Sequence, residues 1–454
     1  MNVAARPVAD LVVRHAGELV TCREGAGTGR TPTAGGAGDS GARLGVVVDG
    51  ALAAASGRIV WVGRDAELAD AVAVTSATRV LDAEGRVVMP GIVECHTHVV
   101  FGGDRADEYQ LRVRGATYGE IAAAGGGILS TVRATRAASF EELRRGGARR
   151  LQLLLEHGVT TVEVKSGYGL TVAHELRLLE VYADLARSGP QTLVPTLLGA
   201  HTVPPEYTGR AEAYVDLVAG EMIPAAAERG LAVCCDVFVE EGAFTLSQAR
   251  RVLQAGAAHG LRPKLHVDQL SPGGGAELAA ELGALSADHL DHVSDAGTAA
   301  LAEAGVVAVL LPGAVFFLGL RDYAPARRLL DPGVRVALST DCNPGTCNTE
   351  NVFLMGTIAS SQMGMRVDEV VRALTVEAAH AVGLAHDVGS LEPGKRADLV
   401  VLDATSHLSI PYHWGIDPVA MVVKDGRIVC DRGGAASGPA ESGAAAVPHE
   451  GGAR

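Results

Sequence analysis

Two histidines separated by a single residue, His96 and His98, are the first side chains in the sequence that suggest chemistry. They follow a short apolar run in the segment MPGIVECHTHVVFGG. Side chains two positions apart on a strand point to the same side, so both imidazoles would face one point. This spacing also occurs in hydrogen-bonded core histidines, so a metal site needs further ligands elsewhere in the chain.

Three later segments supply such ligands. KLHVDQLS contains His266, SADHLDH contains His289 and ALSTDCNPGT contains Asp341, each at the end of a predicted strand. A catalytic metal needs about three or four nitrogen or oxygen ligands and an open position for water. We therefore predict a metal site formed by His96, His98, His266 and Asp341. His289 exceeds that set, and we expect it to polarise a substrate carbonyl or stabilise an oxyanion.

These residues need a scaffold that brings distant strand ends together. After Pro90, short apolar stretches alternate with helical segments such as 140–156 and 174–187. This alternation indicates βα units and a parallel sheet, and eight strands close a barrel whose active site lies at the carboxyl ends of the strands. The predicted barrel strands are 92–97, 160–165, 193–200, 233–239, 264–267, 287–289, 306–311 and 336–340.

The two chain ends are predicted to form a second unit. Short strands precede the barrel, and the strand pattern returns after residue 388. These strands are 10–13, 45–48, 58–62, 79–82, 398–403 and 420–424. We therefore expect an α/β protein with a TIM-like (β/α)8 barrel at 91–385 and a small composite β-sandwich built from 1–90 and 386–432. The segments 25–42 and 433–454 are rich in small residues and are predicted to be disordered.

Charge and composition limit the partners. The net charge of −14 argues against nucleic acid. The N-terminus lacks the features of a secretory signal, and no uninterrupted apolar stretch is long enough to predict a membrane span. The seven cysteines are odd in number and scattered, which favours reduced thiols in the cytoplasm. We therefore expect a cytoplasmic protein that acts on a small molecule.

Longer segments make a family resemblance specific. ECHTHVVFGGDRADEY, TTVEVKSGYGL, LLGAHTVPPEY, CDVFVEEGAF and STDCNPGT occur in family order over roughly residues 90–350 and resemble the imidazolonepropionases, a family of metal-dependent amidohydrolases. The resemblance implies hydrolysis of the cyclic C–N bond of 4-imidazolone-5-propanoate to N-formimidoyl-L-glutamate, the third step of histidine degradation. It also implies the four metal ligands already predicted, and a homodimer is expected because it is common among such enzymes.

The resemblance further implies contacts to a substrate with a carboxylate tail. These contacts fall on Arg105, Tyr168, His201, Gln269, Asn343, Gly345 and Thr346. The planar guanidinium of Arg105 suits bidentate pairing with the carboxylate. Tyr168 lies between two glycines, which permit an unusual backbone path over a ligand. His201 is assigned to the substrate as a donor and not to the metal.

Three residues are candidates for proton transfer. Asp341 is expected to accept the proton of the attacking water, with His289 as an alternative. Gln269 cannot take up a proton at neutral pH, so we expect it to orient the water or the ring.

Some amidohydrolases bridge two metals with a carboxylated lysine from the fourth barrel strand. Lys165 ends the predicted second strand, and VCCDVFVEEG, which contains the fourth strand, has no lysine. One metal ion per subunit is therefore predicted. Imidazole and carboxylate ligands suit zinc, iron and manganese alike, so Zn(2+) and Fe(3+) stay open, with zinc favoured.

Two other functions stay open. A different cyclic-amide hydrolase, or an aminohydrolase acting on a heteroaromatic ring, would keep the metal ligands but would not need Arg105 or KSGYGL. An inactive relative that serves as a scaffold would typically lose metal ligands, and none of the four is missing.

Overall fold

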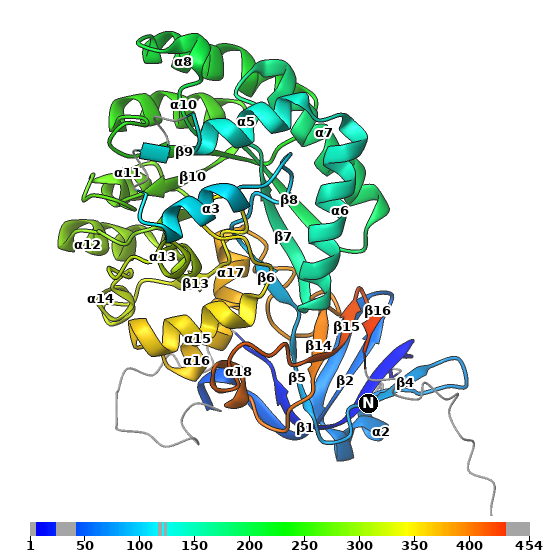
Figure 1. Ribbon diagram of the computed structural model, residues 1–454. Helices are drawn as coiled ribbons and strands as arrows, with labels where there is room; N and C mark the ends of the chain where they lie inside the picture. Colours follow the sequence, from blue (N-terminus) through cyan, green and yellow to red (C-terminus); the bar gives the residue numbers. More distant parts are fainter. Residues whose placement is uncertain (1–5, 24–41, 117–119, 122–124, 433–454) are drawn as a thin grey trace, which may run out of the picture.

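The computed structural model describes residues 6–23, 42–116, 120–121 and 125–432. Two bodies are visible in Figure 1: a barrel surrounded by helices, and a sheet in which blue strands from the start of the chain lie beside orange and red strands from its end. The segments predicted to be disordered, 25–42 and 433–454, lie outside the described residues except for residue 42. None of the described helices is long and apolar enough to span a membrane.

The barrel contains eight parallel strands in sequential order. They are β6 (Ile92–Glu94), β7 (Val159–Lys165), β8 (Thr192–Ala200), β9 (Cys234–Val239), β10 (Arg262–Val267), β11 (Ser286–His289), β12 (Val307–Leu310) and β13 (Val336–Leu338). The predicted fold class is confirmed, since every barrel strand lies at a predicted position. The segments that follow the first and last strands meet at an isolated parallel bridge between Thr97 and Cys342, where the His98 N–H also donates to the Cys342 carbonyl at 2.9 Å.

Helices follow most barrel strands and cover the outside of the barrel (Figure 1). Two of them begin at capping boxes: Ser139 and Glu142 start α6, and Thr245 and Gln248 start α10. Such reciprocal bonds satisfy backbone N–H groups that have no partner within the helix. The main helices are α6 (Phe140–Glu156), α7 (Val172–Ser188), α8 (Ala211–Leu217), α9 (Ile223–Glu228), α10 (Leu246–Ala258), α11 (Gly275–Glu281), α12 (Asp295–Ala304), α15 (Val352–Met363), α16 (Val367–Ala373) and α17 (Val376–Ala381).

The loop after β6 is elaborated, as its length predicts. It contains α3 (Ala106–Val113) and α5 (Ile128–Ala137). Tyr109 of α3 stacks on Phe317 of α13 (Pro312–Leu318) with ring centroids 5.1 Å apart. The loop after the first barrel strand therefore contacts the loop after the seventh.

The second sheet joins both chain ends. Its order is β16-β15-β14-β5-β1-β2-β3, with β4 paired to β1. The strands are β1 (Leu11–Val20), β2 (Val46–Ala55), β3 (Arg58–Arg64), β4 (Arg79–Asp82), β5 (Val87–Pro90), β14 (Leu399–Leu402), β15 (Val419–Lys424) and β16 (Arg427–Asp431). Two of these strands, β5 and β16, were not predicted from the sequence. β5 lies between β1 and β14 in the sheet. Because β5 leads through Gly91 directly into β6, the sheet is attached at the start of the barrel.

More than one apolar core holds this sheet. Val13, Leu52 and Val401 belong to a core of its own, whereas Val400 and Val422 belong to the core of the barrel. Neighbouring residues of β14 thus serve the two bodies, as expected for side chains that alternate across a strand.

Candidate metal centre and active site

The predicted ligands meet at the carboxyl ends of the barrel strands. Nε2 of His96 and Nε2 of His98 lie 3.5 and 3.7 Å from Oδ1 of Asp341. His266 lies against His96 with ring centroids 4.4 Å apart. All four residues are at most 3% exposed. Residues from β10 and from the segments after β6 and β13 are thereby brought into one cluster.

His289 lies in the same cluster. Ligand atoms of His96, His98 and Asp341 come within 4.8 Å of one another, and so do those of His96, His266 and His289. Its ring centroid is 5.5 Å from that of His96 and 5.4 Å from that of His266. The structure therefore places His289 directly beside the four predicted metal ligands.

The donors fit a metal ion. Nε2 of His96 and Nε2 of His266 are buried and have no hydrogen-bond partner among the described residues. A buried polar atom without a partner destabilises the fold unless it binds a ligand. Burial lowers the pKa of His96 and of His98 well below the usual value, so these imidazoles are neutral. Neutral imidazole is the form that coordinates a metal.

Backbone strain accompanies the site. Asp341 has φ 54° and His289 has φ 81°, in the left-handed region that residues other than glycine rarely adopt. Such conformations cost about 1–3 kcal/mol and tend to occur at functional sites. Burial raises the pKa of the Asp341 carboxyl to about 7, and its Oδ2 accepts a hydrogen bond from Oγ1 of Thr346 at 3.1 Å.

Carboxylates stand behind two of the histidines. Nδ1 of His96 hydrogen-bonds with Oδ2 of Asp288 at 2.7 Å, and Nδ1 of His266 lies 3.0 Å from Oδ2 of Asp236. A carboxylate at one ring nitrogen fixes the tautomer and directs the other nitrogen to a metal. Neither aspartate was predicted from the sequence. A signal was available for Asp236, which is the one charged residue in the otherwise apolar strand β9, whereas Asp288 lies in the short strand β11 between Ala287 and His289.

Arg105 is held at the edge of the cluster. Its Nε donates to Oε2 of Glu108 at 2.8 Å, and Glu108 accepts in turn from Oγ of Ser130 and the N–H of Gly127. A side chain at Gly345 would lie 2.1 Å from Nη1 of Arg105. The guanidinium therefore lies directly on the loop that follows Asp341, and the missing side chain of Gly345 leaves the room for it.

The loop after Asp341 is organised by Asn343. Its Oδ1 accepts the N–H groups of Gly345 and Thr346 at 2.8 Å each, and its Nδ2 donates to the Asp341 carbonyl and to Oγ1 of Thr346. The predicted contacts Asn343, Gly345 and Thr346 are thus adjacent to the cluster, and their internal bonds also fix the backbone of Asp341.

Tyr168 and His201 cover the side of His98. The rings of His98 and His201 stack at 5.2 Å, and that of Tyr168 is 5.7 Å from His98. Gly167 has φ 106°, and a side chain there would meet Nδ1 of His201 at 2.8 Å. The glycine before Tyr168 is therefore required by both the backbone path and the packing.

Glu175 secures the Tyr168 loop. Its buried carboxylate accepts the N–H groups of Gly167, Gly169 and Leu170 at 2.9, 2.7 and 2.7 Å. This residue, the fourth of α7, was also missed by sequence analysis, since an acidic residue in the first turn of a helix is ordinary.

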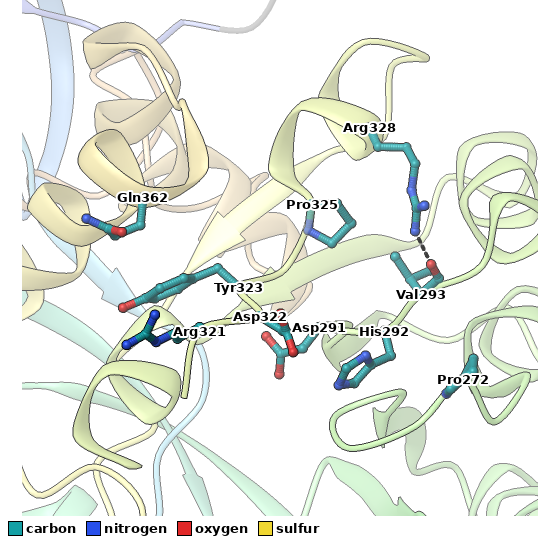
Figure 2. A pocket seen from close by; sticks show the side chains of 10 residues that line it. All are labelled: Pro272, Asp291, His292, Val293, Arg321, Asp322, Tyr323, Pro325, Arg328 and Gln362. Carbon is teal, nitrogen blue, oxygen red and sulfur yellow. Dashed lines mark hydrogen bonds between the residues drawn. The ribbon is translucent and has the colours of Figure 1, made fainter. Parts of the chain in front are cut away.

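Gln269 has a different environment. It lines a pocket of ≈150 Å³ with Asp291 and His292, and no hydrogen bond joins it to the histidines in the described part of the chain. A larger pocket of ≈590 Å³ shares Asp291 and His292. Figure 2 shows the carboxylates of Asp291 and Asp322 side by side there, next to His292. Gln269 therefore lies at the wall of the smaller pocket, which none of the five cluster residues lines.

Residues 87–429 match the model of the Amidohydrolase family. Imidazolonepropionase from Symbiobacterium thermophilum is 52% identical over 429 residues, covering 94% of this chain and 99% of that protein. Imidazolonepropionase from Geobacillus kaustophilus is 49% identical, covering 93% and 98%.

Solved structures agree on the fold. A zinc-bound adenosine deaminase from Xanthomonas campestris superposes with a TM-score of 0.69 at 20% identity, covering 94% of both chains. A 5-methylcytosine deaminase from Klebsiella pneumoniae gives 0.69 at 17% identity, covering 93% of this chain and 98% of the other. At such identities the likeness concerns architecture alone. The sequence relatives are far closer, and the chain belongs to the amidohydrolase family and, within it, to the imidazolonepropionases.

Proposed function

We propose that this protein hydrolyses the cyclic amide bond of 4-imidazolone-5-propanoate to give N-formimidoyl-L-glutamate. The observation that carries the proposal is the position of Arg105, whose guanidinium lies against Gly345 in the loop that follows Asp341. A fixed arginine beside a histidine–aspartate cluster suits a substrate with a carboxylate tail next to the bond to be broken. The name of the close relatives supports the same substrate.

One metal ion is proposed for the cluster, with His96, His98, His266 and Asp341 as its ligands. Three imidazoles and one carboxylate fit zinc and iron alike. The zinc bound in the adenosine deaminase that shares this fold supports zinc as the first choice. When bound, the ion supplies a water molecule of lowered pKa and polarises a carbonyl oxygen.

The residues around the ion divide the remaining work. Asp341 takes the proton of the attacking water and delivers it to the ring nitrogen as the C–N bond breaks. His289 stabilises the negative charge that develops on the carbonyl oxygen. The oxygen of the water becomes part of the new carboxylate, so atoms and charge balance without another reactant.

The substrate is held from two sides. Arg105 pairs with the propanoate group, and Tyr168 and His201 contact the ring. Nδ1 of His201 lies 3.0 Å from the Gly167 carbonyl, an oxygen that can only accept, so the proton of the neutral ring is on Nδ1. Burial lowers the pKa of His201 to about 3, which keeps it neutral. His201 therefore offers Nε2 as an acceptor for a ring N–H, and not the donor that the family resemblance suggested.

A cytoplasmic location is proposed from the thiols. All seven cysteines are free, and six of them are buried. Free thiols in this number are typical of a reducing compartment.

The test is a ring-opening assay on the purified, metal-loaded protein. Imidazolone propanoate is compared with hydantoins, guanine and cytosine, and the metal content is measured in parallel. Loss of the imidazolone absorbance with formation of formimidoylglutamate is the expected result. Turnover of another ring and none of the imidazolone would refute the substrate assignment, with ammonia release indicating an aminohydrolase. A protein that binds no metal and stays inactive after reconstitution would refute the enzyme itself.

A further inference from the structure

Behind the histidine cluster, inside the barrel, lies a fully buried lysine. Lys165 is 0% exposed, and its Nζ lies 2.7 Å from Oδ2 of Asp236, 2.9 Å from Oε1 of Glu163 and 3.4 Å from Oδ2 of Asp288. An ammonium group has three N–H donors, so one group can satisfy three carboxylates at once. Isolated buried charges are very costly, and this arrangement provides the pairing that each of them needs.

Two of these carboxylates are the ones behind the metal ligands. Asp288 hydrogen-bonds with Nδ1 of His96, and Asp236 contacts Nδ1 of His266. Ligand atoms of the two aspartates and of His266 lie within 4.8 Å of one another. Without a cation between them, two carboxylates this close would repel each other and turn away. Lys165 therefore contacts both of the aspartates that lie against Nδ1 of His96 and Nδ1 of His266.

The same contacts exclude a bridging role for Lys165. A carboxylated lysine carries a negative charge, and here Nζ lies among three carboxylates. Burial opposes the charge of the ammonium, but Asp236, Glu163 and Asp288 outweigh it and raise the pKa of Lys165 well above its usual value. The side chain is thus a cation, and it acts through the aspartates.

We propose that Lys165 is a positioning residue of the metal centre: it fixes Asp236 and Asp288 and through them directs Nε2 of His96 and Nε2 of His266 at the metal. This inference rests on the metal site proposed above and adds the group that holds two of its ligands. A neighbouring lysine cannot replace it, because Nζ of Lys264 is 3.8 Å from Asp288 and donates to Oγ of Ser286 at 2.7 Å.

The first test is Lys165→Met, which keeps the length of the side chain and removes the ammonium. Loss of such a support typically weakens metal affinity by about 10–100-fold, and we expect a change of that size in the Kd measured against a chromophoric chelator. In the cobalt(II)-substituted protein, the visible absorption bands should also shift, because the imidazoles are no longer held at one angle.

A matched control separates positioning from stability. Lys424 is 3% exposed and pairs with Asp398 at 2.8 Å in the second sheet, away from the metal centre. Lys424→Met should lower the melting temperature, as Lys165→Met does, while the metal Kd and the cobalt spectrum stay those of the wild type.

Further variants keep the inference testable if Lys165→Met does not fold. Lys165→Met with Glu163→Gln removes a repelling carboxylate that contacts no histidine, so stability should return while metal affinity stays weak. Asp288→Asn keeps an acceptor for His96 but loses its charge pairing, and it should weaken the Kd and shift the spectrum.

The outcomes are distinct. Wild-type affinity and spectrum in Lys165→Met, or full recovery of affinity in the double variant, would overturn the positioning role. A wild-type protein without metal affinity would instead refute the proposed metal site.

Discussion

The position of Arg105 gives the most direct test of the proposed substrate, through the substitution Gly345→Ala. The added Cβ would lie 2.1 Å from Nη1 of Arg105, whereas ordinary contacts begin at 3.4 Å, so the guanidinium must move by roughly 1.3 Å (3.4 − 2.1). Because Glu108 holds Nε, the group cannot simply slide along its own plane. Gly345 does not have a positive φ, so alanine brings no backbone strain there.

A displacement of this size breaks one good hydrogen bond to the carboxylate. Hydrogen bonds to charged groups contribute about 1.5–3 kcal/mol, which corresponds to an increase of about 10–100-fold in KM. Since the carboxylate is held equally before and during the reaction, kcat should change little. An imidazolone without the propanoate group should show the same poor kinetics with the wild type and the variant.

The assay is steady-state ring opening, with metal content matched between proteins. Gly220→Ala serves as the control, because nothing lies within 4 Å of the added Cβ and the glycine has no positive φ. An unchanged KM in Gly345→Ala, or an equal loss on the substrate without a carboxylate, would refute the assignment of Arg105.

Four further predictions concern the cluster and its supports. Removal of the metal by a chelator should abolish turnover and lower the melting temperature, and zinc should restore both. Asp341→Asn should lower kcat by about 10²–10⁴ in assays of metal-loaded protein, as expected when a proton-transfer group is lost. His289→Gln should lower kcat by about 10²–10³ while one metal ion per chain is retained; loss of the metal would make His289 a ligand. Glu175→Gln loses an acceptor for the loop that carries Tyr168, so chemical denaturation should show destabilisation by about 1–3 kcal/mol, with a higher KM.

The sequence predicted the barrel and the membership of the cluster well, for physical reasons. Strands buried on both faces produce apolar runs, and histidines at their ends interrupt those runs visibly. β5 was missed because its apolar residues continue through Gly91 into the first barrel strand. Nothing in the local sequence marks the point where the chain leaves one sheet for the other.

The groups behind the site were harder to predict. Lys165 was recognised only as a misplaced candidate for a metal bridge, since its partners Asp236 and Asp288 lie 71 and 123 residues away in sequence. Charged residues at alternate positions of buried strands, as in Glu163 and Lys165, are a signal for a polar layer within a barrel. The sequence pattern thus predicts that a polar layer exists inside the barrel, but only the fold shows which charged residues pair within it.

The closure of the barrel has a consequence for how the protein assembles. The segments that follow its first and last strands meet at the Thr97–Cys342 bridge, and the proposed ligands lie on both sides of this seam, with His96 and His98 on one edge and Asp341 on the other. An ion bound there would link two edges of the barrel whose ligands lie about 245 residues apart in the sequence. Amide hydrogen exchange should therefore respond to metal more strongly at this seam than elsewhere in the chain. A newly made chain would reach its full stability only after the metal ion binds.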